Sequence, residues 1–300
     1  MRLCDSHCHF FSSRFLEILT KDLADFPADS RADAVAARLG WEAPGTAEAL
    51  AERWVAELNR QKVARSVLIA SIPGDEASVA AAVAKYPKRF VGFFMFNPLA
   101  PDAAARLAHA LGKQQMRGIA LFPAMHRYRL EDAAITAVFE SAVAHDAAVF
   151  VHCGVLSVGV RKKLGLQSSF DVRLGDPLAV AALAQRYPSV PVIIPHFGAG
   201  LFREALMAAD QCSNVCLDTS SSNTWMKYHP GLTLEDVFRH ALAVTGPDRL
   251  LFGTDSSFFP RGWQKPVHDA QLAALDAIGV GENDRAKILG ANFERLFPNV

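Results

Sequence analysis

The chain has 300 residues, of which 51% are hydrophobic and 21% are charged. That length can bury a large core, and α/β barrels commonly use it for one domain, so we expect residues 1–300 to form a single domain. Lys plus Arg total 31 and Asp plus Glu also total 31. Without an excess of charge, the balance argues against nucleic acid and against anionic membranes as partners, and favours a small molecule.

The N-terminal residues lack the basic start, apolar run and cleavage site of a signal peptide, and no apolar run reaches membrane-spanning length. The five cysteines are scattered, which argues against a disulfide framework in a chain of this size. These features lead us to expect a cytoplasmic protein.

Short apolar runs alternate with amphipathic segments, a pattern typical of βα units that surround a parallel sheet. Several runs are almost continuous in Val, Ile, Leu and Phe, as expected for strands covered on both faces. We predict an α/β fold, a (β/α)8 TIM barrel. The eight strands are predicted at Leu3 to His9, Ser66 to Ala70, Val91 to Phe96, Gly118 to Phe122, Ala148 to His152, Val192 to His196, Val215 to Asp218 and Leu250 to Asp255.

Helical spacing of Ala and Leu predicts helices between these strands. The clearest are Glu76 to Tyr86, Ala103 to Leu111, Ile135 to His145 and Leu178 to Tyr187. The segment from Ser12 to Asn59 is longer than a simple connection, so extra helices are expected there, over one mouth of the barrel.

Four histidines and one aspartate fall at the carboxyl ends of the predicted strands: His7, His9, His152, His196 and Asp255. In a (β/α)8 barrel these ends converge on the face that carries catalytic groups. His7 and His9 are two residues apart on a strand, so their side chains leave on the same face. Together with His152 they could supply the three protein ligands of a catalytic metal site.

Each of these residues also has an ordinary structural interpretation. A His-x-His pair occurs by chance, a lone histidine at a strand end is commonly a hydrogen-bonded core or surface residue, and Asp255 could cap a helix or form a turn. Their shared position at one end of the barrel favours a functional site.

The motifs in chain order resemble those of the amidohydrolase superfamily. They are Asp5-x-His7-x-His9, Val151-His152-Cys153-Gly154, Pro195-His196-Phe197-Gly198 and Phe252-Gly253-Thr254-Asp255. The chain is most similar to the branch that includes aminocarboxymuconate-semialdehyde decarboxylase, related aromatic-acid decarboxylases and lactone hydrolases. The stretch from Ile288 to Phe297 resembles the C-terminal helix of that branch, so extra helices are also expected at the C-terminus.

The resemblance implies one divalent ion held by His7, His9, His152 and Asp255, with His196 beside it. Zinc is the first choice, and manganese, iron or cobalt would also suit such ligands. Binuclear relatives use a lysine at the end of the fourth strand, and Gly118 to Pro123 contains none. The resemblance therefore favours a mononuclear site, and a possible homodimer.

The resemblance further implies a hydrolase that acts on a small ester, lactone or amide. Asp255 would take a proton from water bound to the ion, and His196 would stabilise the oxyanion or assist proton transfer. The alternative is a metal-dependent, non-oxidative decarboxylase of an unsaturated or aromatic carboxylic acid. The ligands alone do not separate the two reactions.

A carboxylated substrate would need cations or aromatic rings near the metal. Candidate substrate contacts lie in segments expected on the active face: His126, Arg127, Tyr128, Arg203, Arg261 and Trp263, with Arg161 and Lys227 as further cations. Arg261 and Trp263 follow Asp255 most closely. A solvated loop is the competing interpretation for His126 to Tyr128.

Other classes of function fit less well. Gly198-x-Gly200 lacks the third glycine of a dinucleotide-binding motif, because Arg203 stands in its place. The stretch from Gly154 to Gly159 has the wrong spacing for the nucleophile turn of a serine hydrolase. A non-catalytic barrel that serves as a binding module stays open as an alternative, to be distinguished by metal content.

Overall fold

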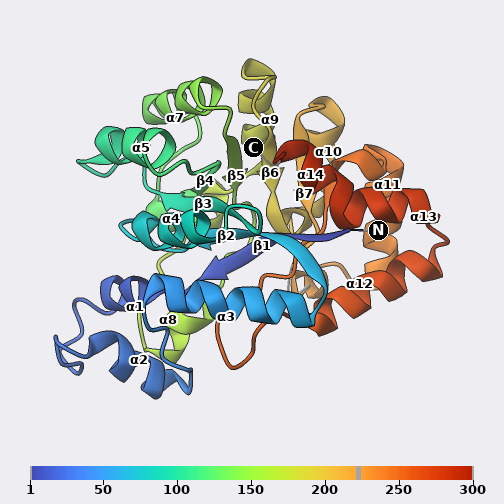
Figure 1. Ribbon diagram of the computed structural model, residues 1–300. Helices are drawn as coiled ribbons and strands as arrows, with labels where there is room; N and C mark the ends of the chain where they lie inside the picture. Colours follow the sequence, from blue (N-terminus) through green and yellow to red (C-terminus); the bar gives the residue numbers. More distant parts are fainter. Residues whose placement is uncertain (1, 221–223, 299–300) are drawn as a thin grey trace.

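Eight parallel strands form one sheet in the computed structural model, which describes residues 2–220 and 224–298 (Figure 1). Their order follows the sequence, as predicted for a (β/α)8 barrel. The strands are β1 Leu3–Phe10, β2 Val63–Ala70, β3 Phe90–Phe96, β4 Gly118–Leu121, β5 Ala148–Val151, β6 Val192–Ile194, β7 Val215–Asp218 and β8 Leu250–Leu251.

The barrel closes between β1 and the residues that follow β8. The amide of Ser6 donates to the carbonyl of Phe252 at 2.8 Å, and the amide of Asp255 donates to the carbonyl of His7 at 2.9 Å. A single bridge pairs Cys8 with Ser256. Closure therefore sets the segment that carries Asp255 directly beside the strand that carries His7.

Alternate residues of each strand face two different cores. On β2, Val67 and Ile69 belong to a cluster that fills the barrel, whereas Leu68 and Ala70 belong to the layer between strands and helices. Burial on both faces is the physical reason why the strands are almost continuously apolar. The predicted fold class is confirmed.

A ring of helices covers the outside of the barrel. The four helices predicted from sequence spacing appear as α4, α5, α7 and α9, with boundaries shifted by at most two residues. The ring is made of α3 Ala47–Arg60, α4 Glu76–Lys85, α5 Ala103–Gly112, α7 Ala133–Ala144, α9 Pro177–Arg186, α10 Phe202–Gln211, α11 Leu234–Thr245 and α12 Lys265–Ala277.

Three short helices lie together at the mouth toward which β1 points (Figure 1). These are α1 Ser13–Leu19, α2 Arg31–Leu39 and α8 Gly159–Lys163, called the helical cover below. Their apolar side chains form a separate cluster that includes Phe15, Val35 and Val160. The long segment after β1 was predicted to form helices over one mouth. Only α1 and α2 do so, because α3 packs beside β2 as part of the ring.

The C-terminal residues form α13 Glu282–Ala286, a π-helical turn Lys287–Ala291 and α14 Asn292–Leu296, which confirms the extra helices expected there. The side-chain NH2 group of Asn292 donates to the backbone carbonyls of Pro247 and Leu250 at 2.7 and 2.9 Å. These bonds hold the C-terminal helices against β8. None of the helices in residues 2–220 and 224–298 is both long and apolar enough to cross a membrane.

Replacing Gly290 by Ala tests this C-terminal packing. A β-carbon at Gly290 would collide with the backbone carbonyl of Arg2, which cannot move without disturbing β1. We expect Gly290→Ala to lower the free energy of unfolding by about 1–3 kcal/mol, as overpacking does, and to lower the thermal unfolding temperature. Gly159→Ala is the control, because nothing lies within 4 Å of a β-carbon there. Equal unfolding temperatures for the two variants would contradict this account.

Candidate metal centre

The five residues predicted at strand ends all lie at the carboxyl end of the barrel. His7 and His9 belong to β1, and His152 comes directly after β5. The strands that precede His196 and Asp255 end earlier than predicted, and both residues have left-handed backbone conformations, with φ of +56° and +59°. Such conformations are unfavourable for residues other than glycine and cluster at functional sites. Here they occur at two residues that face the barrel mouth.

Three of the four predicted ligands converge on one point. His9 Nε2 lies 3.3 Å from His7 Nε2 and 3.0 Å from Asp255 Oδ1, and His7 Nε2 lies 3.7 Å from that same oxygen. The ligand atoms of this trio all lie within 4.8 Å of one another. His152 stands outside the trio but lines the same cavity. Its ring centroid is 5.3 Å from that of His196, and its buried Nδ1 has no hydrogen-bond partner among the described residues.

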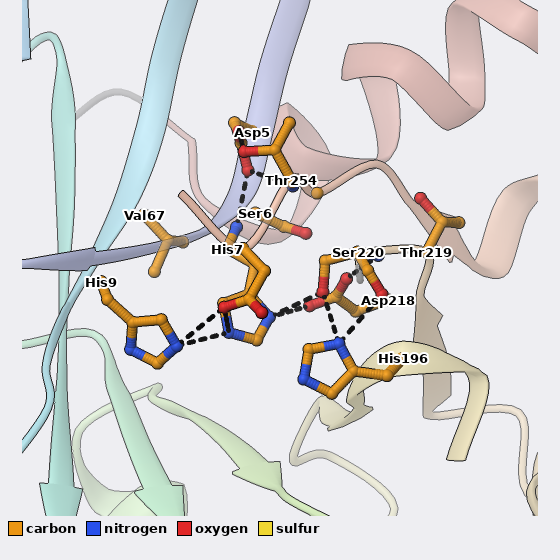
Figure 2. Close-up of polar contacts among 12 residues, drawn as sticks. Asp5, Ser6, His7, His9, Val67, His196, Asp218, Thr219, Ser220 and Thr254 are labelled. Atoms are coloured by element: carbon orange, nitrogen blue, oxygen red, sulfur yellow. Dashed lines mark hydrogen bonds and ion pairs between the residues drawn. The ribbon is translucent and has the colours of Figure 1, made fainter. Parts of the chain in front are cut away.

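Behind the trio, Asp218 orients His7. Asp218 is the last residue of β7, is fully buried, and places Oδ2 2.7 Å from His7 Nδ1 (Figure 2). Because a carboxylate can only accept, Nδ1 carries the proton and the lone pair of Nε2 faces the cavity. Burial lowers the pKa of His7, but the charge and hydrogen bond of Asp218, together with the charges of Asp255 and Asp5, outweigh burial, so that the pKa lies above its ordinary value.

Ser71 orients His9 in the way that Asp218 orients His7. The Ser71 hydroxyl donates to the carbonyl of Ile69 at 2.9 Å, so its oxygen accepts a hydrogen bond from His9 Nδ1–H at 2.7 Å. Nε2 of His9 is therefore also left with a lone pair. Burial lowers the pKa of His9, and lowers that of His152 well below its usual range. Both imidazoles are kept neutral, which is the form that binds metal ions.

His196 lies beside the trio and is held by Ser220. The backbone carbonyl of Ser220 lies 2.9 Å from His196 Nδ1, and the Ser220 hydroxyl lies 3.0 Å from that atom and 2.9 Å from His7 Nδ1 (Figure 2). A carbonyl only accepts, so His196 is protonated on Nδ1 and its Nε2 is a free acceptor. Burial lowers the pKa of His196, which keeps the ring neutral.

Asp5 joins β1 to the segment that carries Asp255. Its buried carboxylate accepts from the Thr254 hydroxyl at 2.6 Å, the Trp263 indole at 2.7 Å and the His7 amide at 2.9 Å. Burial raises the pKa of Asp5 despite these three donors. The first residue of the Asp5-x-His7-x-His9 motif is therefore a structural anchor rather than a ligand.

A glycine makes room for these contacts. A β-carbon at Gly253 would lie 2.8 Å from Asp218 Oδ1, 2.9 Å from Ser220 Cβ and 3.0 Å from His7 Cβ. Any larger residue would push the Asp218 carboxylate away from His7. The glycine before Thr254-Asp255 is thus required by close packing.

Sequence reasoning did not single out Asp218, Ser220 or Ser71. Asp218 had a usable signal, since it ends an apolar strand in the same way as His152 ends its own. The two serines had none, because serine is common after strands and only the folded barrel shows which imidazole each one contacts.

The candidate ligands lie at the floor of a cavity of about 660 Å³. Its walls come from the helical cover, from the segments after β5 and β7, and from the segment after β8. The lining includes His7, His9, Phe11, Phe15, Trp41, Ser71, Phe122, His152, Lys163, His196, Trp225, Lys227, Asp255, Phe258 and Arg261. This is the size of pockets that bind small organic molecules, which are about 300–1,000 Å³.

The three candidate substrate contacts after β4 do not line this cavity. His126 ends the short helix α6 (Pro123–His126), where burial lowers its pKa to about 4, and its ring packs beside Tyr128. Tyr128 is buried in the layer between strands and helices. Arg127 is exposed and donates to the carbonyl of Ser169 at 3.3 Å.

The candidates farther along the chain separate into two groups. Arg203 lies outside the cavity, exposed on α10 and paired with Glu204, and Arg161, on α8, donates to the Ser168 hydroxyl at 3.1 Å. Trp263 lies beneath the site, where its indole holds Asp5. Arg261 and Lys227 do line the cavity. Arg261 donates to the Ser257 hydroxyl at 2.6 Å.

Comparison with known proteins places the chain in a family. The amidohydrolase family model matches residues 4–298. The chain belongs to the amidohydrolase family. The resemblance inferred from the four motifs is thus confirmed over nearly the whole chain. A search of curated proteins finds no match.

Solved structures of other proteins share the fold. The 5-carboxyvanillate decarboxylase of Sphingomonas paucimobilis is 17% identical, with a TM-score of 0.67, over 100% of this chain and 99% of that one. A probable 2-pyrone-4,6-dicarboxylic acid hydrolase of Acinetobacter baumannii, with citric acid bound, is 16% identical, with a TM-score of 0.63, over 99% of both chains. An amidohydrolase of Burkholderia multivorans with bound zinc is 17% identical, with a TM-score of 0.64, over 99% of both chains.

Asp218→Asn tests the support of His7. The Ser220 amide donates to Asp218 Oδ1 at 2.5 Å, so the asparagine oxygen would take that position and its NH2 group would face His7. Nδ1 would then have to accept, and the proton would move to Nε2, the proposed ligand atom. We expect zinc affinity to fall about 10–100-fold, as for other groups that orient metal ligands, measured by competition with a chelator.

The exposed Asp210 on α10 provides the matched control, since Asp210→Asn makes the same chemical change away from the site. Unchanged zinc affinity in Asp218→Asn, with a normal unfolding temperature, would contradict the role given to Asp218.

Proposed function

We propose that this protein is a metal-dependent hydrolase that acts on a small ester, lactone or amide. The observation that carries the proposal is the trio of His7 Nε2, His9 Nε2 and Asp255 Oδ1, within 4.8 Å of one another. The partners of the two imidazoles put both protons on Nδ1. When both rings are neutral, three electron-rich atoms face one another with no proton between them.

Such an arrangement is repulsive on its own and is stabilised by a cation. One carboxylate oxygen and two imidazole nitrogens suit zinc, manganese, iron or cobalt, and His152 is the candidate fourth ligand because its neutral ring lines the same cavity. Zinc is our first choice. When bound, a divalent ion would lower the pKa of water toward neutrality and polarise a substrate carbonyl.

The surrounding residues support distinct roles for Asp255 and His196. Burial raises the pKa of Asp255, but its contact with His9 and its interactions with His7 and His196 lower the pKa below its ordinary value, so the carboxylate is ionised and able to accept a proton. The neutral His196 ring presents an unprotonated Nε2. That state favours proton transfer through Nε2 over donation to an oxyanion.

Non-oxidative decarboxylation is the second candidate. It is supported by the similarity of the fold to a 5-carboxyvanillate decarboxylase. In that reaction His196 or Asp255 would deliver the proton that replaces carbon dioxide on the substrate carbon. Under either reaction we propose a carboxylated small molecule as the substrate, with Arg261 as a contact, because this cation lines the cavity.

The metal requirement is tested first. Purified protein supplemented with zinc should hold about one ion per chain, measured by elemental analysis, and His7→Ala should reduce this strongly. Less than about a tenth of an ion per chain after supplementation, with no difference between wild type and His7→Ala, would favour the non-catalytic binding module instead.

The reaction is tested with zinc-loaded protein on a panel of lactones, esters and aromatic carboxylates, following acid release and carbon dioxide separately. His196→Ala should keep the zinc and lower kcat about 10²–10⁴-fold, the usual contribution of general acid–base groups. His240→Ala, on the exposed face of α11, is the control and should behave as wild type. Formation of carbon dioxide without release of acid would contradict the hydrolase proposal and support the decarboxylase.

A further inference from the structure

Asp255 has an unusual backbone conformation at the floor of the cavity. Its φ of +59° lies in the left-handed region, which a residue with a β-carbon keeps only where its surroundings hold it there. In this conformation the Asp255 carboxylate comes within 3.0 Å of His9 Nε2. The groups that hold the turn at Asp255 therefore also decide whether this candidate ligand reaches the metal centre.

Gln264, nine residues farther along the chain, contacts the backbone on both sides of that turn. Its side-chain Nε2 lies 2.9 Å from the carbonyl oxygen of Thr254 and 2.9 Å from that of Asp255. Carbonyl oxygens only accept hydrogen bonds, so the NH2 group of Gln264 faces them and donates one proton to each. The two carbonyls belong to the peptide groups that flank the Asp255 α-carbon, so these bonds restrain both of its backbone dihedral angles.

The backbone of Gln264 is itself anchored. Its amide donates to the Ser256 hydroxyl at 2.9 Å, and its carbonyl accepts from the Val267 amide at 3.0 Å at the start of α12. The hydroxyls of Ser256 and Thr254 lie 2.6 Å apart, and Thr254 donates to the Asp5 carboxylate at 2.6 Å. Hydrogen bonds therefore connect α12 with the buried carboxylate at the seam, where β1 meets the segment after β8.

Arg261 contacts the same turn less closely. Its guanidinium donates to the Asp255 carbonyl at 3.3 Å and to the Ser257 hydroxyl at 2.6 Å. Arg261 also lines the cavity, so a bound ligand can compete for it. Gln264 is half-buried and is not among the described residues that line the cavity. Its two bonds to the turn are therefore free of competition from a ligand.

We propose that Gln264 is a positioning residue of the metal centre, which holds the left-handed backbone of Asp255 and so keeps the Asp255 carboxylate beside His9. Without the NH2 group, two successive carbonyls would lose a shared donor, and the turn would relax toward an ordinary conformation that carries the carboxylate away. The side chain bonds backbone carbonyls, so its effect on metal binding passes through Asp255. This inference rests on the proposed function, because Asp255 is a metal ligand only under that function.

The first test follows the backbone and needs no metal. The amides of Asp255 and His9 both donate across the seam, at 2.9 and 2.7 Å, so their hydrogen exchange reports how firmly the turn lies against β1. Gln264→Met keeps the length of the side chain and removes both donors. We expect exchange at these two amides to become about tenfold faster, measured by NMR on the full chain. The Ser6 amide, which donates across the seam before the turn at 2.8 Å, should keep its rate.

The second test measures zinc affinity by competition with a chelator. Gln264→Met should weaken zinc binding about tenfold, as expected for a group that orients a metal ligand. In an Asp255→Ala background the same change should weaken binding by less than about twofold, because the ligand through which Gln264 acts is absent. Gln211→Met is the matched control, since this glutamine is exposed at the end of α10, and it should leave both exchange and zinc affinity unchanged.

Unchanged exchange at Asp255 in Gln264→Met would overturn the proposal. So would an equal loss of zinc affinity with and without the Asp255 carboxylate, since Gln264 would then act on the fold in general. A failure of the proposed function gives a different result, because wild type would bind no zinc while the exchange difference persisted in the metal-free chain. If only the role of Gln264 were wrong, wild type would bind zinc and the exchange difference would be absent.

Discussion

The convergence of His7 Nε2, His9 Nε2 and Asp255 Oδ1 is the constraint on which the rest of the site depends. The lone pair of a neutral imidazole and a carboxylate oxygen repel each other. The rings of His7 and His9 nevertheless face Asp255, because hydrogen bonds fix the Nδ1 atom of each ring. Asp218 accepts from one ring and Ser71 from the other. The residues behind the ligands thus decide which nitrogen faces the cavity, and so decide what the site can bind.

That arrangement depends in turn on barrel closure. Asp5 is buried at the seam and accepts from Thr254, Trp263 and the backbone of His7. An ionisable group in such a place costs free energy unless its oxygens are satisfied, and here several donors satisfy them. The result is that the first strand and the segment after the last strand hold the candidate ligands in one fixed relation.

The mouth of the cavity is built from different elements than the floor. The floor is made of strand ends and is set by the barrel, whereas the mouth is made of the helical cover and of loops, which can vary without disturbing the core. The mouth carries aromatic rings, among them Trp41 and Phe258, and the cations Lys163, Lys227 and Arg261. We propose that residues at the mouth, rather than the strand ends, select the substrate.

The sequence by itself determined the fold class, the family and the positions of the five strand-end residues. Strand periodicity and position along a parallel strand are local properties, so they can be counted in the sequence. Only the tertiary structure decided which of them meet. It brought His7, His9 and Asp255 together and left His152 beside them, and it removed Trp263 and Tyr128 from the cavity wall because burial against distant strands outweighs closeness in sequence. Asp218 could be recognised in the sequence as a strand-end residue, but its hydrogen bond to His7, like that of Ser220, came from the fold alone, because a contact across more than 200 residues has no local signature.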